Sequence, residues 1–260
     1  MRLTVSDVIG QEELERDYEP FRVALQEALD MEVEFFPVES LIAVVPALLS
    51  NQTDLIFSGA SEYLLLKARA KAVPVVALAR QNYHTVFVVR ADSGIKSLTD
   101  LKGKTVAMHK VGGTPGHIWP SKMLMEAGLD VDSDINVQFL SFKGFDALRK
   151  GEVDAWVAAS FRYEEFLEQA GLSKEEFPAI VSGEPLPDDI FAANVNLDPK
   201  FIDEVGSRMI ENSEKLVQAM LVAPENDPKF RDAVFIPPQE NEYDQLREIY
   251  YEIGQEALIQ

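Results

Sequence analysis

The chain has 260 residues, 47% of them hydrophobic, so it can form two domains of roughly 100–150 residues or one large domain. Its 44 acidic residues outnumber its 24 basic ones, and the net charge of −20 argues against a nucleic-acid partner, which needs a basic face. The lack of cysteine excludes disulfides and thiolate chemistry, and no apolar run reaches the ~20 residues that span a bilayer.

Hydrophobic periodicity predicts strands that alternate with helices in the first part of the chain. The expected strands are 2–9, 33–38, 54–59, 73–79 and 83–93. The expected helices are 12–30, 40–50, 61–71 and 97–101, the last with Ser97 as its N-cap. Such alternation is typical of an α/β domain with a mainly parallel sheet.

The same alternation continues to the end of the chain. The expected strands are 104–109, 135–141, 153–160 and two strands within 179–195 separated by a proline-rich bend. The expected helices are 114–127, 143–150, 161–170, 199–222, 226–233 and 241–257. We therefore expect two α/β lobes, with lobe 1 formed by 1–88 plus 183–260 and lobe 2 formed by the inserted residues 89–182. Two strands cross between the lobes, and such a pair can act as a hinge that closes a cleft.

Residues 104–120, "KTVAMHKVGGTPGHIWP", combine a strand, a glycine turn and a helix start. Pro115 falls near the first helical position, where its missing N–H costs nothing. The N-terminus of a helix presents free N–H groups and a partial positive charge, so this stretch fits an anion site. Two simpler alternatives stay open: an ordinary βα turn that binds nothing, and Thr114 as a plain N-cap.

A second helix start follows the expected strand 54–59. Ligands of open α/β sheets sit beyond the carboxyl ends of the strands, so Ser58 and Ser61 are candidates to contact the same ligand. The alternative is that Ser61 only caps its helix.

The sequence gives no sign of a metal site, a cofactor or catalysis. The three histidines, His84, His109 and His117, lack the helical spacing of zinc ligands. There is no Gly-x-Ser-x-Gly turn and no Walker lysine, so we expect no catalytic residues and no enzyme. Met1 runs straight into "RLTVSDVIG" without a secretory signal, which leaves a cytosolic protein or an exported one whose signal was removed.

Residues 59–120 resemble the phosphonate/phosphite-binding (PhnD-like) subunits of ABC transporters, above all in the run "NYHTVFVVRADSGIKSLTDLKGKTVA". "LRKGEVDAWVA" and "PLPDDIFAANVNLDP" resemble the same family in the expected order. The resemblance implies a type II periplasmic binding protein, with two α/β lobes joined by two crossing hinge strands and a small oxyanion held in the cleft. It also implies a periplasmic or extracytoplasmic location and a membrane permease as partner. We expect a monomer.

The resemblance also implies which residues contact the ligand. The family's Ser-Thr-Ser-Gly turn falls on Gly113–Gly116, where only Thr114 and Gly116 keep the family's residue type. The hinge-strand tyrosine falls on Tyr83, and the aspartate of the proline bend falls on Asp189. The expected ligand-binding set is Thr114, Asp189, Tyr83, Gly113, Gly116, Ser141, His117, Ser58 and Ser61.

Departures from the family pattern bear on the ligand. A family tyrosine, histidine and glutamate fall near Leu41, Ser141 and Phe161. Without the glutamate an aminoalkyl cation loses its counter-charge, which argues against aminoalkylphosphonates. Each hydrogen bond lost to a charged ligand is worth about 1.5–3 kcal/mol, so other groups must replace the lost serines or the ligand is a different anion or acid. That alternative would serve a sensor or a cytosolic module.

The chemistry of Asp189 and the strand position of Tyr83 limit how these two side chains can contact a ligand. An aspartate that faces an oxyanion must meet a protonated oxygen, so Asp189 would select ligands that still carry a proton. The alternative for Asp189 is a turn cap. Tyr83 alternates with His84 along a strand, so the two side chains point to opposite faces and cannot line one wall. Trp119 and Trp156 are expected in the core.

Overall fold

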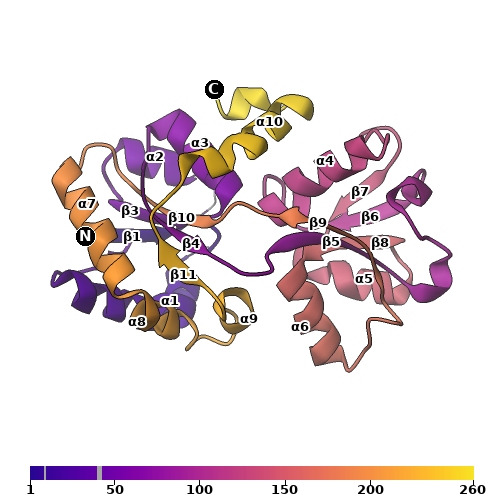
Figure 1. Ribbon diagram of the computed structural model, residues 1–260, viewed down its shortest axis with the longest axis horizontal. Coiled ribbons are helices and arrows are strands. Elements are labelled where there is room, and N and C mark those ends of the chain that lie inside the picture. Colours follow the sequence, from indigo (N-terminus) through magenta and orange to yellow (C-terminus); the bar gives the residue numbers. More distant parts are fainter. Residues whose placement is uncertain (9, 40–42) are drawn as a thin grey trace. The chain divides into compact units, whose positions relative to one another are not determined.

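The computed structural model describes residues 1–8, 10–39 and 43–260 (Figure 1). It divides into two compact units. Unit 1 comprises Met1–Gln81, Pro187–Glu248 and Gly254–Gln260, and unit 2 comprises Asn82–Leu186 and Ile249–Ile253. The chain thus leaves unit 1 after Gln81 and returns after Leu186, so most of unit 2 is an insertion.

Unit 1 is built on a six-stranded sheet of order β11-β4-β10-β3-β1-β2. The strands are β1 (Arg2–Val5), β2 (Glu34–Phe35), β3 (Leu55–Ser58), β4 (Val73–Ala79), β10 (Asp189–Ala193) and β11 (Val234–Ile236). Strand β1 is parallel to β2 and β3, whereas β10 is antiparallel to both β3 and β4. The expectation of a mainly parallel sheet is therefore only partly met, because the returning strand β10 inserts between two strands of the opposite direction.

The helices of unit 1 follow the predicted order, and residues 40–42 of the helix expected over 40–50 lie outside the described residues. They are α1 (Gln11–Leu29), α2 (Val44–Leu49), α3 (Ala60–Ala70), α7 (Pro199–Glu211), α8 (Ser213–Met220) and α9 (Asp227–Phe230). The chain closes with η6 (Glu240–Tyr243), α10 (Asp244–Glu252) and η7 (Glu256–Leu258). The single helix expected over 199–222 is divided at Asn212, whose side-chain amide donates to the carbonyl of Arg208.

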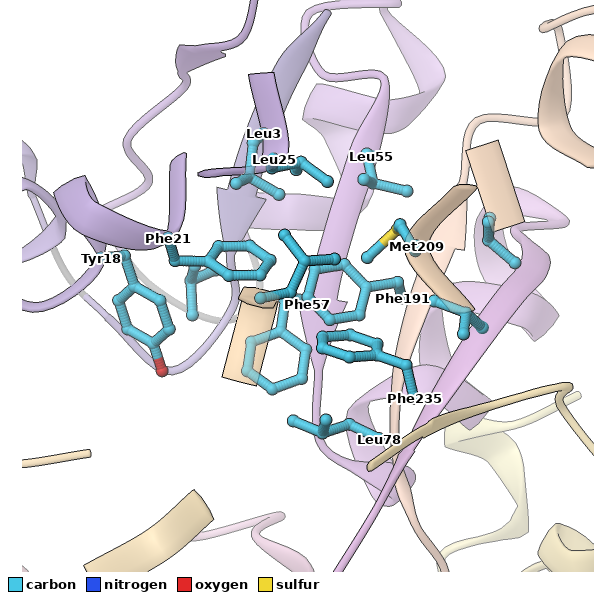
Figure 2. Packing of buried hydrophobic residues seen from close by; sticks show 14 of the residues in the cluster. Leu3, Tyr18, Phe21, Leu25, Leu55, Phe57, Leu78, Phe191, Met209 and Phe235 are labelled. Carbon is cyan, nitrogen blue, oxygen red and sulfur yellow. The ribbon is translucent and has the colours of Figure 1, made fainter. Parts of the chain in front are cut away.

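A cluster of aromatic rings lies within the largely aliphatic core of unit 1 (Figure 2). The helical repeat that predicted α1 places Tyr18, Phe21 and Leu25 in this core, which confirms its amphipathic character. Phe57 of β3 stacks on Phe191 of β10 with ring centroids 4.5 Å apart, and Phe21 lies 5.6 Å from Phe191. Phe235 belongs to the same cluster and comes from β11, a strand that the sequence did not predict. Three residues are too short a run to show a period of two.

Unit 2 contains a five-stranded sheet of order β7-β6-β8-β5-β9. Its strands are β5 (His84–Val89), β6 (Thr105–Met108), β7 (Asn136–Phe139), β8 (Ala155–Ala159) and β9 (Ala179–Pro185). Strand β6 is parallel to β7 and β8, and β5 is antiparallel to β8 and β9. The expected lobe boundaries at 88/89 and 182/183 fall inside β5 and β9, which are paired within unit 2.

The helical segments of unit 2 follow the predicted order except at Ala91–Ser93, which form a 3₁₀ turn, because the strand expected over 83–93 ends at Val89. They are η2 (Ala91–Ser93), η3 (Leu98–Leu101), η4 (Thr114–Ile118), α4 (Trp119–Glu126), η5 (Ser141–Lys143), α5 (Gly144–Lys150) and α6 (Ser160–Ala170). Ser97 caps η3 in a capping box with Asp100, which confirms its predicted role. Trp119 and Trp156 are buried, as expected of core residues.

Close packing of α7 on the unit 1 sheet depends on Gly206. A Cβ at this position would lie 2.8 Å from the carbonyl oxygen of Val75 in β4. We predict that Gly206→Ala lowers the free energy of unfolding by about 1–3 kcal/mol, because the clash outweighs the ~1 kcal/mol gain in helix propensity. Urea unfolding measures the change, with the exposed neighbour Ser207→Ala as control. A stability equal to or above that of the wild type would contradict this role.

Candidate functional site

Polar side chains gather at one edge of the unit 1 sheet. Strands β1, β3 and β4 end at this edge, and the antiparallel strand β10 begins there. Ser6 follows β1, Ser58 ends β3, Asp189 begins β10 and Arg80 follows β4. Because neighbouring strands lie about 4.8 Å apart, these four residues form a row across adjacent strands.

Arg80 and Asp189 form a buried ion pair in this row. Nη2 of Arg80 lies 2.9 Å from Oδ2 of Asp189, and the two side chains are only 4% and 5% exposed. Removal of one partner would leave a desolvated charge, so the pair holds the end of β4 against the start of β10. Asp189 is therefore more than a turn cap. Arg80 was not among the predicted site residues, because its partner Asp189 lies far away in the sequence.

The hydroxyls of Ser6 and Ser58 are buried, and among the described residues neither has a hydrogen-bond partner. A buried hydroxyl without a partner costs about 1–3 kcal/mol, so both are suited to a bound polar group. The N-cap of α3 is Gly59, so the alternative of Ser61 as a plain N-cap is wrong. Ser61 lies inside the helix, and its hydroxyl donates to Oε2 of Glu62 at 3.2 Å.

Two carboxyl groups near this edge are easily protonated. Burial raises the pKa of Glu62 to about 7, and the negative charges of Asp7 and Asp189 add to the effect. Burial also raises the pKa of Asp188 to about 6, assisted by the charge of Glu242. The edge therefore carries proton-binding groups close to neutral pH, which sequence reasoning did not identify because their pKa values depend on burial.

The glycine turn of unit 2 has the predicted strand–turn–helix form. Gly112 has φ +84°, a left-handed conformation that favours glycine. A Cβ on Gly116 would lie 2.5 Å from Cβ of His109, so only glycine fits where the turn folds back on β6. The Thr85 hydroxyl of β5 donates to the carbonyl of Pro115 at 3.0 Å and fixes the turn to the sheet.

The helix start after this turn differs from the expected one. Gly113 is the N-cap, so the alternative of Thr114 as N-cap is wrong, and Thr114 is the buried first residue of η4. Segment η4 is a single π-helical turn, in which the N–H groups of His117 and Ile118 both donate to the carbonyl of Gly113. Such wide turns recur at functional sites, and residue periodicity does not reveal them.

His117 supports the turn through its ring. Its Nδ1 accepts a hydrogen bond from the N–H of Gly112 at 3.0 Å, and burial lowers its pKa. The ring edge contacts Phe139, with centroids 5.1 Å apart. Nδ1 of the neutral imidazole is therefore occupied by the hydrogen bond from Gly112, and only Nε2 remains to contact a ligand.

The other predicted residues of unit 2 lie at the same sheet edge. Tyr83 precedes β5, and its ring lies 6.4 Å from that of Phe161, the second residue of α6. Ser141 follows β7 with φ +49°, and its N–H donates to the carbonyl of His109 at 3.1 Å. A non-glycine residue in the left-handed region is uncommon and often marks a functional site. Leu41 lies outside the described residues.

A cation that the sequence analysis missed lies within this group. The Arg162 guanidinium is 5.3 Å from the centre of the Phe161 ring and 5.2 Å from that of Phe142. Its Nη1 also pairs with Glu165 at 2.6 Å. Unit 2 thus brings Tyr83, Gly113, Thr114, Gly116, His117 and Ser141 to one edge, and unit 1 brings Ser58, Ser61 and Asp189 to another.

The lowered pKa of His117 has a consequence for stability. The folded state binds this proton less well than the unfolded chain, so the stabilisation is fully present above about pH 6.5 and is lost as the pH falls. In the variant His117→Asn, the side-chain oxygen Oδ1 can accept the same hydrogen bond from the N–H of Gly112, but the amide does not titrate. We predict that the urea midpoint of the wild type falls relative to that of the variant between about pH 7 and pH 5. A difference that does not change with pH would contradict this role.

The chain resembles known proteins in sequence. The family model for "ABC transporter, phosphonate, periplasmic substrate-binding protein" matches residues 4–234. The phosphate-import protein PhnD of Mycolicibacterium smegmatis is 24% identical over 218 residues, which are 77% of this chain and 68% of that protein. The probable phosphite-binding protein PhnD1 of Prochlorococcus marinus is 27% identical over 159 residues, 57% of this chain and 50% of that protein.

A solved structure shows the same fold. PhnD1 from Prochlorococcus marinus, in complex with methylphosphonate, matches with a TM-score of 0.80 and 18% sequence identity over 98% of both chains. The fold is that of the type II periplasmic binding proteins, as expected from the sequence. Since the family model covers most of the sequence, the chain belongs to the phosphonate-type periplasmic substrate-binding proteins of ABC transporters.

Proposed function

We propose that the chain captures a small oxyanion of the phosphonate or phosphite type for an ABC importer. The observation that carries the proposal is the glycine turn before Thr114, which joins the end of β6 to a helix start in a chain of this family. Backbone N–H groups at such a start favour an anion without needing a basic protein surface. The relatives named for phosphate import and phosphite binding support the same ligand class.

Each unit offers its own candidates for ligand contact, one buried cation and several hydroxyls. In unit 1 we assign ligand contact to Ser58 and the Arg80–Asp189 pair, and in unit 2 to Thr114, Ser141 and Tyr83. Arg80 supplies positive charge beside Asp189, so Asp189 does not meet the ligand as an isolated anion. This arrangement supports anion binding by a chain whose net charge is −20.

We further propose that the chain works outside the cytoplasmic membrane as a monomer, without catalysis or nucleic-acid binding, and delivers its ligand to a permease. The family is periplasmic and serves ABC transporters, which supports the location and the partner. In the described part of the chain no helix is long and apolar enough to cross a bilayer. Nor do its His, Asp and Glu residues form a group of three that could hold a metal ion. A sensor or a cytosolic module is not favoured by the family match.

Ligand class is tested by isothermal titration of the whole chain. We expect the phosphorus oxyanions phosphite, methylphosphonate and phosphate to bind more tightly than sulfate and small carboxylates, because Asp189 favours a small anion that still carries an acidic proton near neutral pH. Sulfonate buffers are avoided, since they resemble the ligand. If no phosphorus oxyanion binds at about 1 mM, the proposed ligand class is wrong while the fold stands.

The turn itself gives a second test. Pro115→Ser adds a hydroxyl and an N–H at the helix start, so we predict about tenfold tighter binding of methylphosphonate. Pro199→Ser, an exposed proline at the first residue of α7 in unit 1, is the matched control and leaves affinity unchanged. Weaker binding by Pro115→Ser would mean that the proline turn is adapted to a different ligand.

A further inference from the structure

The N-terminus of α3 already holds an anionic group from the chain itself. Oε2 of Glu62 lies 2.5 Å from the position that a Cβ on Gly59, the N-cap, would take. The Ser61 hydroxyl donates to the same oxygen at 3.2 Å. Glu62 is the third residue of the helix, and its carboxyl group lies next to the N-cap residue. Its carboxyl therefore stands where an external oxyanion would bind.

A second observation supports a ligand site at the N-terminus of α3. Ser58, directly before the N-cap, is 3% exposed, and its hydroxyl has no hydrogen-bond partner among the described residues. Ser6, on the neighbouring strand end, is 1% exposed and equally without a described partner. An ordinary helix cap would not require two unsatisfied hydroxyls beside it, whereas a bound oxyanion would accept from them.

The charges around Glu62 oppose its ionised form. Asp7 after β1 and Asp189 of β10 both act on it, and each is paired with a cation. Lys229 lies 3.1 Å from Asp7, and Arg80 lies 2.9 Å from Asp189. Of the other elements packed against α3, α2 has no titratable side chain in Val44–Leu49, and Glu240 of η6 is paired with Lys67. Asp188 precedes β10 as a further acid.

We propose that Glu62 couples anion binding by unit 1 to proton uptake, because an oxyanion enters at the N-terminus of α3 only when Glu62 takes up a proton from solvent. As a carboxylate, Glu62 repels the ligand, because both groups are negatively charged. As a neutral acid it has an O–H and donates a hydrogen bond to the bound oxyanion. This inference rests on the proposed anion-binding function and adds that binding and proton uptake are coupled. The raised pKa of Glu62, about 7, means that the uptake is measurable near neutral pH.

Proton uptake on binding is measured with methylphosphonate by pH-stat titration of the full chain in unbuffered solution. At about pH 8 we expect the wild type to take up nearly one proton more per ligand than Glu62→Gln. We also expect the wild-type affinity to fall about tenfold per pH unit above pH 7 beyond any change seen in the variant. Glutamine keeps the side-chain oxygen at the helix start without the charge. Glu12→Gln, an exposed acid in the first turn of α1, is the matched control and behaves as the wild type.

Measurements on the ligand-free wild type and Glu62→Gln distinguish the proposal for Glu62 from the proposed anion-binding function. Because folding raises the pKa of Glu62, its stabilising effect is present at low pH and is lost as the pH rises through about 7. The urea midpoint of the wild type should therefore fall relative to that of Glu62→Gln between about pH 5 and pH 8. The proposal for Glu62 is overturned if wild type and Glu62→Gln bind methylphosphonate with equal proton uptake. It is also overturned if the difference between their urea midpoints does not change with pH. Absence of binding by both proteins overturns the proposed function instead.

Discussion

The position of β10 between β3 and β4 is the constraint on which the unit 1 site depends. Because this strand runs against both neighbours, its first residue lies at the edge where they end. Asp189 is thus brought beside Ser58 and Arg80, while Phe191, two residues later, stacks on Phe57 in the core. One short strand therefore supplies both a charged partner at the edge and an aromatic ring inside. The burial of that ring fixes the register that places the carboxylate.

Local patterns in the sequence were sufficient for much of the fold. The strand at 73–79 has the bounds that were predicted, and the apolar repeat of α1 points into the core. The glycine turn at 112–116 was also recognisable, because its glycines mark positive φ and close approach. These features depend on neighbours along the chain, which a single sequence contains.

Features that depend on distant residues were not predictable in the same way. Arg80 became significant only when β10 placed Asp189 beside it, more than one hundred residues later in the sequence. Glu62 reads as an ordinary acid at a helix start until burial and two neighbouring carboxylates change its proton affinity. Strand β11 forms because Phe235 fills a place in the aromatic cluster, and its three residues show no periodicity.

The π-helical turn of η4 has a consequence for how this chain can change. A wide turn adds one residue to a helical repeat, so the residues before it need not keep the phase of the helix after it. Trp119 and Leu124 of α4 pack in the core, whereas residues 113–116 form the turn at the edge of the sheet. Substitutions at 113–116 therefore leave the buried face of α4 in register. The extra residue therefore allows the sequence of the turn at 112–116 to change without repacking the buried face of α4.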